Sequence, residues 1–303
     1  MSVRHVVTLA SLPGGALRIL LDGAHRMKAE GRRRRPLLEG RTLAMLFERP
    51  STRTRFSFDV AMRELGGGTI VASGAEMQLG RGETMADTAA VLSRYVDAVM
   101  VRMLDHDGLV SFASASTIPV INGLTRRSHP CQIIADLMTA EERLGPLAER
   151  TLAWVGDGNN VLSTFLEAAP ALGFRMAIAS PPDYALAPAS VDAARCAGAH
   201  VRIADDPHDA VAGADVVVTD TWSSMGDDDE AARRTAFARY QVNEALMAAA
   251  APRAIFLHCL PAHRGEEVTD AVMDGPQSAV FDEAENRVHA QKAILAWVFD
   301  ALD

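Results

Sequence analysis

The 303-residue chain contains almost no lysine: Lys28 and Lys292 stand alone, and the rest of its 30 basic residues are arginine. This shortage excludes a phosphate-binding loop of the Gly-Lys-Ser/Thr type and leaves little lysine for Schiff-base chemistry. Acidic residues number 39, and the net charge of −9 argues against a general nucleic-acid binder, whose surface must attract phosphates. Any anion that the chain binds must be held by a local cluster that works against the overall charge.

Cysteines are also few, and Cys131, Cys196 and Cys259 are too scattered for a disulfide framework. The sequence shows no charged leader followed by an apolar run, and no stretch approaches the ~18 apolar residues of a membrane span. Hydrophobic residues (49%) and charged residues (23%) occur in globular proportions, and the length fits two domains. We expect a reduced, cytoplasmic protein that does not cross a membrane.

Short apolar runs alternate with helical patterns along the whole chain. In the first half we predict strands at 40–48, 69–72, 97–102 and 119–122, and helices at 51–65, 84–95 and 108–115. After a long helix at 131–144, we predict strands at 151–155, 175–179, 200–204, 214–219 and 254–258, and helices at 161–172, 190–197, 207–212 and 243–250. This alternation predicts an α/β fold with two domains, each built on a central parallel sheet flanked by helices.

The two domains are expected at residues 1–137 and 150–285, joined by long helices. The last segment, 286–303, places apolar residues on one helical face over 286–302, and we expect it to pack back on the first domain. The charged runs Arg32–Arg35 and Asp227–Glu230 are interpreted as solvated loops without a function.

The sharpest feature is the segment Ser51–Arg55, with the sequence Ser-Thr-Arg-Thr-Arg, which opens a predicted helix directly after a buried strand. Backbone N–H groups at a helix start lack partners within the helix, and the helix dipole favours negative charge there. Hydroxyl and guanidinium groups add further donors. A serine N-cap beside exposed arginines is the structural alternative, but the density of donors favours a phosphate site for a small molecule.

Two His-Cys segments also follow predicted strands. His129 begins His-Pro-Cys-Gln, and His258 begins His-Cys-Leu-Pro. Zinc binding is one interpretation, but neither segment has the paired spacing of a zinc site. His258 and His263 are five residues apart, across a proline-containing turn and without a second pair. We therefore expect no metal.

A glycine-rich turn, Gly156-Asp157-Gly158, lies between a strand and a helix and partly matches the dinucleotide fingerprint. Val161 replaces the third glycine. The acidic residue that an NAD site needs about 20 positions on is displaced into a turn at Asp183. An NAD-dependent dehydrogenase is therefore an alternative that these residues disfavour.

The polar candidates share one position in the predicted fold. All lie at or just past the carboxyl ends of strands: the Ser51 cluster, Arg102, His129, Asn160, Asp220 and Cys259. In open parallel sheets those ends form the ligand crevice. We expect one site between the two domains, in which Asp220 either accepts from a substrate ammonium group or caps a turn.

In this order along the chain, the segments at 51–55, 129–132 and 258–261 resemble the signatures of the aspartate/ornithine carbamoyltransferase family. Asp220 followed by Ser224-Met225-Gly226 narrows the resemblance to the ornithine carbamoyltransferases, and it covers essentially the whole chain. The resemblance implies transfer of the carbamoyl group of carbamoyl phosphate to the side-chain amine of L-ornithine, giving L-citrulline and phosphate in arginine metabolism. Carbamoyl phosphate would bind to the first domain and ornithine to the second, without a cofactor.

The resemblance also implies a role for individual residues. For carbamoyl phosphate it indicates Ser51, Thr52, Arg53, Thr54, Gln78, Arg102, His129, Gln132, Cys259, Leu260 and Arg287. For ornithine it indicates Asn160, Asp220, Ser224 and Met225, and the catalytic residues would be Arg102, His129, Asp220 and Cys259. Gln78 resembles a residue in a loop that reaches into the neighbouring subunit's site. This implies a homotrimer, or a multiple of trimers, with shared active sites.

The acceptor can be argued from local residues. Residues 76–85 contain no lysine, which an aspartate-specific relative would be expected to supply there. The acidic Asp220 suits a cationic side chain. The resemblance implies that Ser224-Met225-Gly226 favours ornithine over putrescine or acylated ornithine, whose enzymes would be expected to differ there. A member that has lost catalysis and serves as a binding or scaffold protein is a further alternative, and the intact motifs argue against it.

Overall fold

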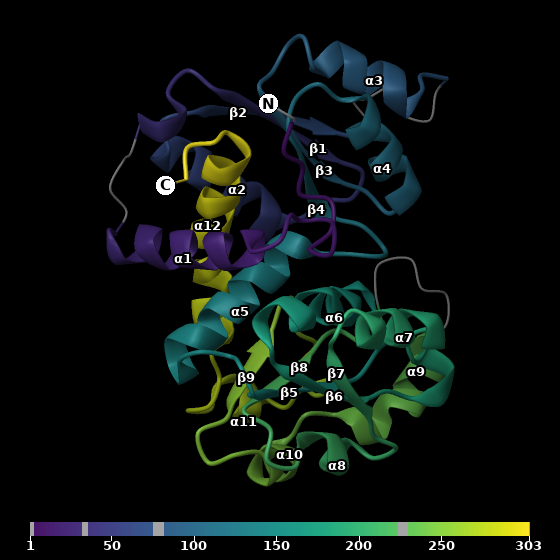
Figure 1. Ribbon diagram of the computed structural model, residues 1–303. Coiled ribbons are helices and arrows are strands. Elements are labelled where there is room, and N and C mark those ends of the chain that lie inside the picture. Colours follow the sequence, from purple (N-terminus) through teal and green to yellow (C-terminus); the bar gives the residue numbers. More distant parts are fainter. Residues whose placement is uncertain (1–2, 32–35, 75–81, 224–229, 303) are drawn as a thin grey trace. The chain divides into compact units, whose positions relative to one another are not determined.

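The apolar runs that follow Arg41 and Arg150 form central strands of two parallel sheets. The structure is a computed structural model and describes residues 3–31, 36–74, 82–223 and 230–302. The chain forms two compact units (Figure 1): unit 1 comprises Met1–Ala135 and Glu285–Asp303, and unit 2 comprises Asp136–Ala284. The expected α/β fold with a parallel sheet in each half is confirmed.

The sheet of unit 1 has the strand order β2-β1-β3-β4, and all its pairs are parallel. The strands are β1 (Thr42–Phe47), β2 (Gly68–Ser73), β3 (Ala98–Arg102) and β4 (Val120–Leu124). The helices are α1 (Ala16–Ala29), α2 (Thr52–Glu64), α3 (Met85–Leu92) and α4 (His106–Ala115), with a short 3₁₀ turn η1 (Pro36–Leu38), and α5 (Pro130–Leu144) begins in this unit. Helices α3 and α4 lie side by side, and α2 lies on the opposite face of the sheet (Figure 1).

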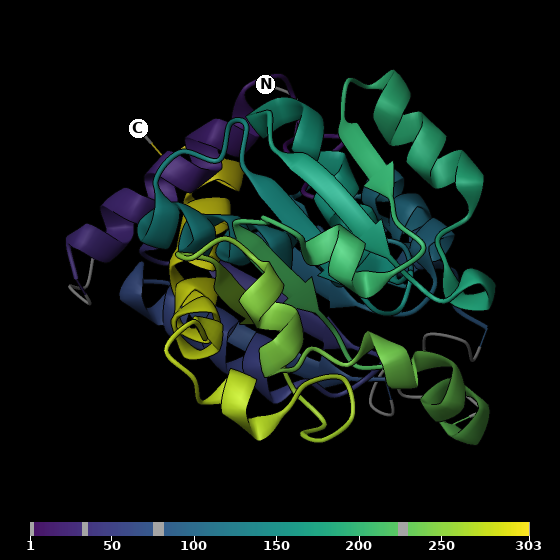
Figure 2. The same cartoon turned by 90° about the horizontal axis from the view of Figure 1, so that it is seen from below.

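The sheet of unit 2 has the order β7-β6-β5-β8-β9, and its strands all point the same way (Figure 2). The strands are β5 (Thr151–Val155), β6 (Arg175–Ala179), β7 (His200–Ile203), β8 (Val216–Thr219) and β9 (Ile255–His258). The helices are α6 (Asn160–Leu172), α7 (Pro188–Cys196), α8 (Pro207–Val211), α9 (Glu230–Phe237), α10 (Glu244–Ala249) and α11 (Asp270–Met273), with 3₁₀ turns η2 (Pro182–Tyr184) and η3 (Ala238–Tyr240). Helices α6 and α7 cover one face, and α8 and α10 cover the other (Figure 1).

In both sheets the strand order reverses at one point. In unit 1 the reversal lies between β1 and β3, where Phe47 pairs with Arg102. In unit 2 it lies between β5 and β8, and β9 follows on the outer side of β8. Loops leave the sheet in opposite directions at such a reversal, so the carboxyl ends of the two strands are open to a ligand. Each unit therefore presents one preferred ligand position.

The last helix, α12 (Val280–Val298), differs from the prediction of a helix at 286–302 with one apolar face. It begins six residues earlier, and Leu302 lies beyond its end. Its polar residues are buried as well as its apolar ones; Asn286, Arg287, His289, Gln291 and Lys292 are all at most 4% exposed. Some of these polar side chains have partners elsewhere in unit 1: Lys292 pairs with Glu64, and Lys28 donates to Asn286. Hydrophobic periodicity does not mark a helix whose polar side chains are also buried, and it therefore misplaced the ends of α12.

The other predicted elements are found within a few residues of their expected bounds, and β5 and β6 match from end to end. Helices α1, α9 and α11 were not among the predicted ranges. Glu230 is the first residue of α9 and not part of a loop, whereas 227–229 and Arg32–Arg35 lie outside the described residues. Across the residues that the structure does describe, none of the helices combines the length and the apolar character that crossing a membrane requires.

Candidate active site

The start of α2 in unit 1 is organised by a serine cap. Ser51 is the N-cap, with extended backbone, and its Oγ accepts from the Thr54 N–H at 3.3 Å. The same hydroxyl donates to Thr54 Oγ1 at 3.1 Å. Thr54 is buried, Arg53 is half-buried, and Thr52 is exposed at the first helical position. The cap therefore orients a hydroxyl-rich helix start at the carboxyl end of β1, next to the strand reversal.

Arg287 connects this helix start to two other helices of the chain. One terminal nitrogen of its buried guanidinium donates to Thr54 Oγ1 at 2.9 Å, and the other donates to Gln132 Oε1. Arg287 lies on α12, Thr54 on α2 and Gln132 on α5. Three residues that the resemblance assigns to one ligand thus meet in one hydrogen-bonded group.

His129 lies among three arginines. Its burial, followed by the positive charges of Arg287, Arg102 and Arg53, holds the pKa of the imidazole well below its ordinary value. The ring is therefore neutral at physiological pH and carries a single N–H. We call the set Arg53, Arg102, His129 and Arg287 the arginine cluster; it concentrates positive charge at one point of an acidic chain, as the sequence required of an anion site.

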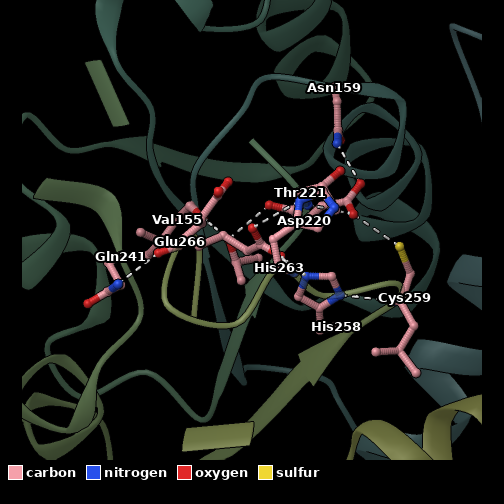
Figure 3. A network of polar contacts seen from close by, with 12 residues as sticks. Val155, Asn159, Asp220, Thr221, Gln241, His258, Cys259, His263 and Glu266 are labelled. Atoms are coloured by element: carbon pink, nitrogen blue, oxygen red, sulfur yellow. Dashed lines mark hydrogen bonds and ion pairs between the residues drawn. The ribbon is translucent and has the colours of Figure 1, made fainter. Parts of the chain in front are cut away.

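Asp220 in unit 2 is placed by strand pairing. Thr219, the last residue of β8, pairs with His258, the last residue of β9, so Asp220 and Cys259 leave neighbouring strands together. Asp220 Oδ1 accepts from the Thr221 N–H at 2.8 Å and from Cys259 Sγ at 3.2 Å (Figure 3). The two residues that were predicted from separate motifs are therefore in direct contact.

Asn159 completes this group and was not predicted. Its Oδ1 accepts from the N–H groups of Val161 and Leu162 at the start of α6, and its Nδ2 donates to Asp220 Oδ2 at 2.7 Å (Figure 3). An asparagine directly before a predicted helix is a common N-cap, and this signal could have identified it. We call Asn159, Asp220, Thr221 and Cys259 the Asp220 network. Asn160, which the resemblance indicated, is the first residue of α6.

The thiol of Cys259 is held in its neutral form. Burial, together with the negative charges of Asp220, Glu283 and Asp136, raises its pKa well above the ordinary value. A thiol that keeps its proton is a hydrogen-bond donor and a poor nucleophile. This agrees with the interpretation that Cys259 need not attack a substrate.

The backbone after Cys259 is fixed by a buried histidine. His258 Nδ1 accepts from the Leu260 N–H at 2.9 Å, and its Nε2 lies 3.2 Å from Glu267 Oε1. Both ring nitrogens are thus engaged, so His258 is not available as a metal ligand, although it lies with Asp220 and Cys259 in a group compatible with one. A second such group comprises His263, Glu266 and Glu267. Its glutamates have other partners: Glu266 pairs with Arg234, and Glu267 faces His258.

The glycine turn at 156–158 packs against another backbone segment of the same chain. A Cβ at Gly158 would lie 2.3 Å from the backbone nitrogen of Leu186 and 2.7 Å from the carbonyl oxygen of Tyr184. Backbone from after η2 therefore occupies the space that the second glycine of a dinucleotide site leaves for a pyrophosphate. This contact argues against the dehydrogenase alternative.

Three other predicted residues, Gln78, Ser224 and Met225, lie outside the described residues.

Comparison with known proteins matches both halves of the chain to one family. Residues 4–142 match "Aspartate/ornithine carbamoyltransferase, carbamoyl-P binding domain". Residues 148–298 match "Aspartate/ornithine carbamoyltransferase, Asp/Orn binding domain". The two matches adjoin between the last turn of α5 and the start of β5, and together they cover nearly the whole chain.

Individual relatives agree with this result. An ornithine carbamoyltransferase of Bradyrhizobium diazoefficiens is 58% identical over 303 residues, covering 99% of this chain and 99% of that protein. The solved ornithine carbamoyltransferase of Pyrococcus furiosus has a TM-score of 0.94 at 45% identity, covering 100% of this chain and 99% of that chain. The anabolic ornithine carbamoyltransferase of Campylobacter jejuni has a TM-score of 0.91 at 38% identity, with 99% of each chain covered.

Proposed function

The chain belongs to the aspartate/ornithine carbamoyltransferase family, and from this premise we propose how its side chains transfer a carbamoyl group from carbamoyl phosphate to L-ornithine. The amine nitrogen of the ornithine side chain attacks the carbonyl carbon. The bond between that carbon and the phosphate oxygen then breaks, and L-citrulline and phosphate are formed. The reaction needs a neutral amine, a donor set for the developing oxyanion and a stabilised phosphate leaving group.

Carbamoyl phosphate is assigned to unit 1. Ser51, Thr52, Arg53 and Thr54 present the phosphate with hydroxyls, a guanidinium and the positive end of the dipole of a 13-residue helix. Arg102 bridges the phosphate and the carbonyl oxygen, and the single N–H of neutral His129 donates to that oxygen. The positive charge of the arginine cluster supports this assignment, because phosphate gains negative charge as it leaves.

The carbamoyl amide needs acceptors as well as donors. Gln132 supplies a side-chain contact, and the backbone carbonyls of Cys259 and Leu260 accept from the carbamoyl NH₂ group. Arg287 holds Gln132 and Thr54 in place through its two donor nitrogens, which supports its assignment to the same ligand.

Ornithine is assigned to unit 2, where Asn160, Asp220, Ser224 and Met225 would contact it. Its side-chain amine resembles that of lysine, with a pKa near ~10.4, and is mostly charged in solution. The neutral form, which has released one proton to solvent, attacks the carbonyl carbon. We assign to Asp220 the role of holding and orienting this amine, and the departing phosphate takes the proton that the nitrogen loses after attack. Cys259 orients Asp220 and is not a nucleophile, since direct attack by the amine suffices.

The observation that carries this assignment is the fixed carboxylate of Asp220, which three donors orient at the strand reversal of unit 2. The test is an acceptor panel with carbamoyl phosphate and ornithine, putrescine, N-acetylornithine or aspartate. Release of citrulline with ornithine alone supports the proposal, and a preference for an uncharged or anionic acceptor contradicts the role of Asp220.

We further propose a homotrimer, or a multiple of trimers, in which Gln78 of one subunit enters the site of the next. Two exposed apolar side chains of unit 1 support an interface there: Phe56 on α2 is 65% exposed, and Ile70 on the edge strand β2 is 55% exposed. Mixing inactive Gln78→Ala protein with inactive Arg102→Ala protein tests this proposal. Shared sites predict partial recovery of activity in the mixture, and separate sites predict none.

We propose a cytoplasmic location for this enzyme. Its three cysteines, Cys131, Cys196 and Cys259, are all free thiols, which is the usual state in a reducing compartment. Fractionation of cells that produce the protein, with citrulline-forming activity followed in each fraction, tests this location.

A further inference from the structure

The side-chain amide of Asn159 in unit 2 both caps a helix and holds a carboxylate. The oxygen of Asn159 accepts from the Val161 N–H at 2.9 Å and from the Leu162 N–H at 3.2 Å, which caps α6. The nitrogen of the same amide donates to Asp220 Oδ2 at 2.7 Å (Figure 3). The cap fixes the amide to the helix start, and the amide in turn fixes the carboxylate.

An amide is needed for both tasks together. Asp, Ser and Thr are good N-caps because they present an oxygen to the helix N–H groups. An ionised carboxylate has no proton to give to Asp220, and the hydroxyl of Ser or Thr, attached directly to Cβ, ends one bond short of the position of the amide nitrogen. A longer glutamine would move the oxygen away from the cap position. Asparagine is therefore the side chain that both accepts from the helix and donates to the carboxylate at this length.

The contact with Asn159 also decides which part of Asp220 remains open. Thr221 and Cys259 both donate to Oδ1, whereas among the described residues Asn159 donates to Oδ2. Each carboxylate oxygen offers about two acceptor positions. Oδ2 therefore keeps room for one further donor, and the Asn159 amide determines the direction from which that donor must come.

We propose that Asn159 is a positioning residue, which aims the second acceptor position of Asp220 Oδ2 at the amine of ornithine. This inference rests on the proposed role of Asp220 in binding that amine. It extends the role to a residue that no substrate assignment includes. It also gives the cap of α6 a part in setting the affinity for ornithine.

Two substitutions separate the tasks. Asn159→Ser keeps a capping oxygen and removes the amide donor, so we expect the KM for ornithine to rise about 10- to 100-fold at every pH, the loss typical of a hydrogen bond to a charged group. The KM for carbamoyl phosphate should change little, and the melting temperature should fall because Asp220 Oδ2 loses a donor.

Asn159→Asp gives a pH-dependent result that capping alone would not produce. Two carboxyl groups 2.7 Å apart share one proton at low pH, and the protonated carboxyl group of the variant then donates to Asp220 as the amide did. As pH rises and this proton is lost, the two carboxylates repel each other. We expect kcat/KM for ornithine, relative to the unchanged enzyme, to fall steadily with increasing pH. An ionised aspartate caps a helix at least as well as asparagine, so a capping role predicts no such fall.

The matched control is Asn243→Asp. Asn243 caps α10 in the same unit through its Oδ1, which accepts from the Leu246 N–H at 3.0 Å, and it is not part of the Asp220 network. This variant should keep the ornithine KM and the pH profile of the unchanged enzyme.

Asp220→Ala shows which of the two proposals fails, if either does. A strong loss in Asp220→Ala, with the expected behaviour of both Asn159 variants, supports the inference. A strong loss in Asp220→Ala while both Asn159 variants behave like Asn243→Asp overturns the positioning role alone. An undiminished Asp220→Ala enzyme overturns the assignment of ornithine to Asp220 and the positioning role with it.

Discussion

Cys259 Sγ lies 3.2 Å from Asp220 Oδ1 and donates a hydrogen bond to it, although the two residues are 39 positions apart in the chain. The parallel pairing of β8 with β9 produces this contact. Thr219 pairs with His258, and the next residues along the two strands are Asp220 and Cys259. The thiol and the carboxylate stabilise each other: the carboxylate helps to keep the thiol protonated, and the protonated thiol orients the carboxylate.

Replacing Cys259 tests this orientation. Cys259→Ala removes the donor and should lower kcat/KM for ornithine about tenfold, which corresponds to ~1.4 kcal/mol. Cys259→Ser keeps a donor and should lose much less. Steady-state kinetics of both variants distinguish donation from nucleophilic attack, because a nucleophile would tolerate neither change.

The buried, neutral His129 predicts a pH-dependent stability. As pH falls through about 6.5, the ordinary pKa of histidine, the unfolded chain binds a proton at this residue and the folded chain does not, because its pKa is lowered. The free energy of unfolding should therefore decrease as pH falls through this range. Denaturant unfolding of the unchanged protein and of His129→Gln at several pH values isolates the contribution of His129 to stability. The free energy of unfolding of the unchanged protein, minus that of the variant, should decrease towards acid pH. A constant difference would contradict a lowered pKa.

Arg287 should resist conservative replacement. Arg287→Lys keeps the charge but places all its donors on one nitrogen, whereas two separate nitrogens of Arg287 donate to Thr54 and Gln132. We therefore expect a higher KM for carbamoyl phosphate, an unchanged KM for ornithine, and a loss of about 1–3 kcal/mol in the free energy of unfolding. The control is Arg143→Lys at an exposed ion pair with Asp282, where surface position predicts little effect. If both variants show the same KM for carbamoyl phosphate and the same free energy of unfolding, Arg287 does not bind carbamoyl phosphate.

Gly158 should not accept a side chain. Gly158→Ala forces a Cβ against the backbone at Leu186, and relief of this contact must move the turn that carries Asn159. We expect destabilisation of about 1–3 kcal/mol and a raised KM for ornithine. Gly14→Ala is the control, since a Cβ there meets nothing within 4 Å. If thermal unfolding and kinetics of the two variants are alike, the turn is not as closely packed as described.

Much of the fold follows from local patterns. Buried strands such as β5 and β6 are short apolar runs bounded by turn residues, and their ends could be predicted to the residue. The candidate residues could be grouped because parallel strands all end on one edge of a sheet. Thr54, Gln132 and Arg287, which the resemblance assigns to one ligand, lie in one hydrogen-bonded group, and their role in binding that ligand stays a prediction.

The parts that were missed depend on contacts between distant residues. The polar face of α12 is buried because Lys292 pairs with Glu64 and Arg287 with Thr54, partners that hydrophobic periodicity does not reveal. The sequence indicates Asn160 and not its neighbour Asn159, because a cap signal says nothing about where the other end of the amide points. The contact of Asn159 with Asp220 spans 61 positions and exists only once β5 and β8 are paired.

Catalysis requires above all an acyl phosphate held at the start of α2 and an amine held by Asp220. A crystal structure with a bisubstrate analogue, in which a phosphonate is linked to ornithine, measures both positions at once. We predict phosphonate oxygens within hydrogen-bond distance of Ser51, Arg53 and Thr54, and the ornithine portion against Asp220. A phosphonate bound away from the start of α2, or an ornithine portion that does not reach Asp220, would contradict the account.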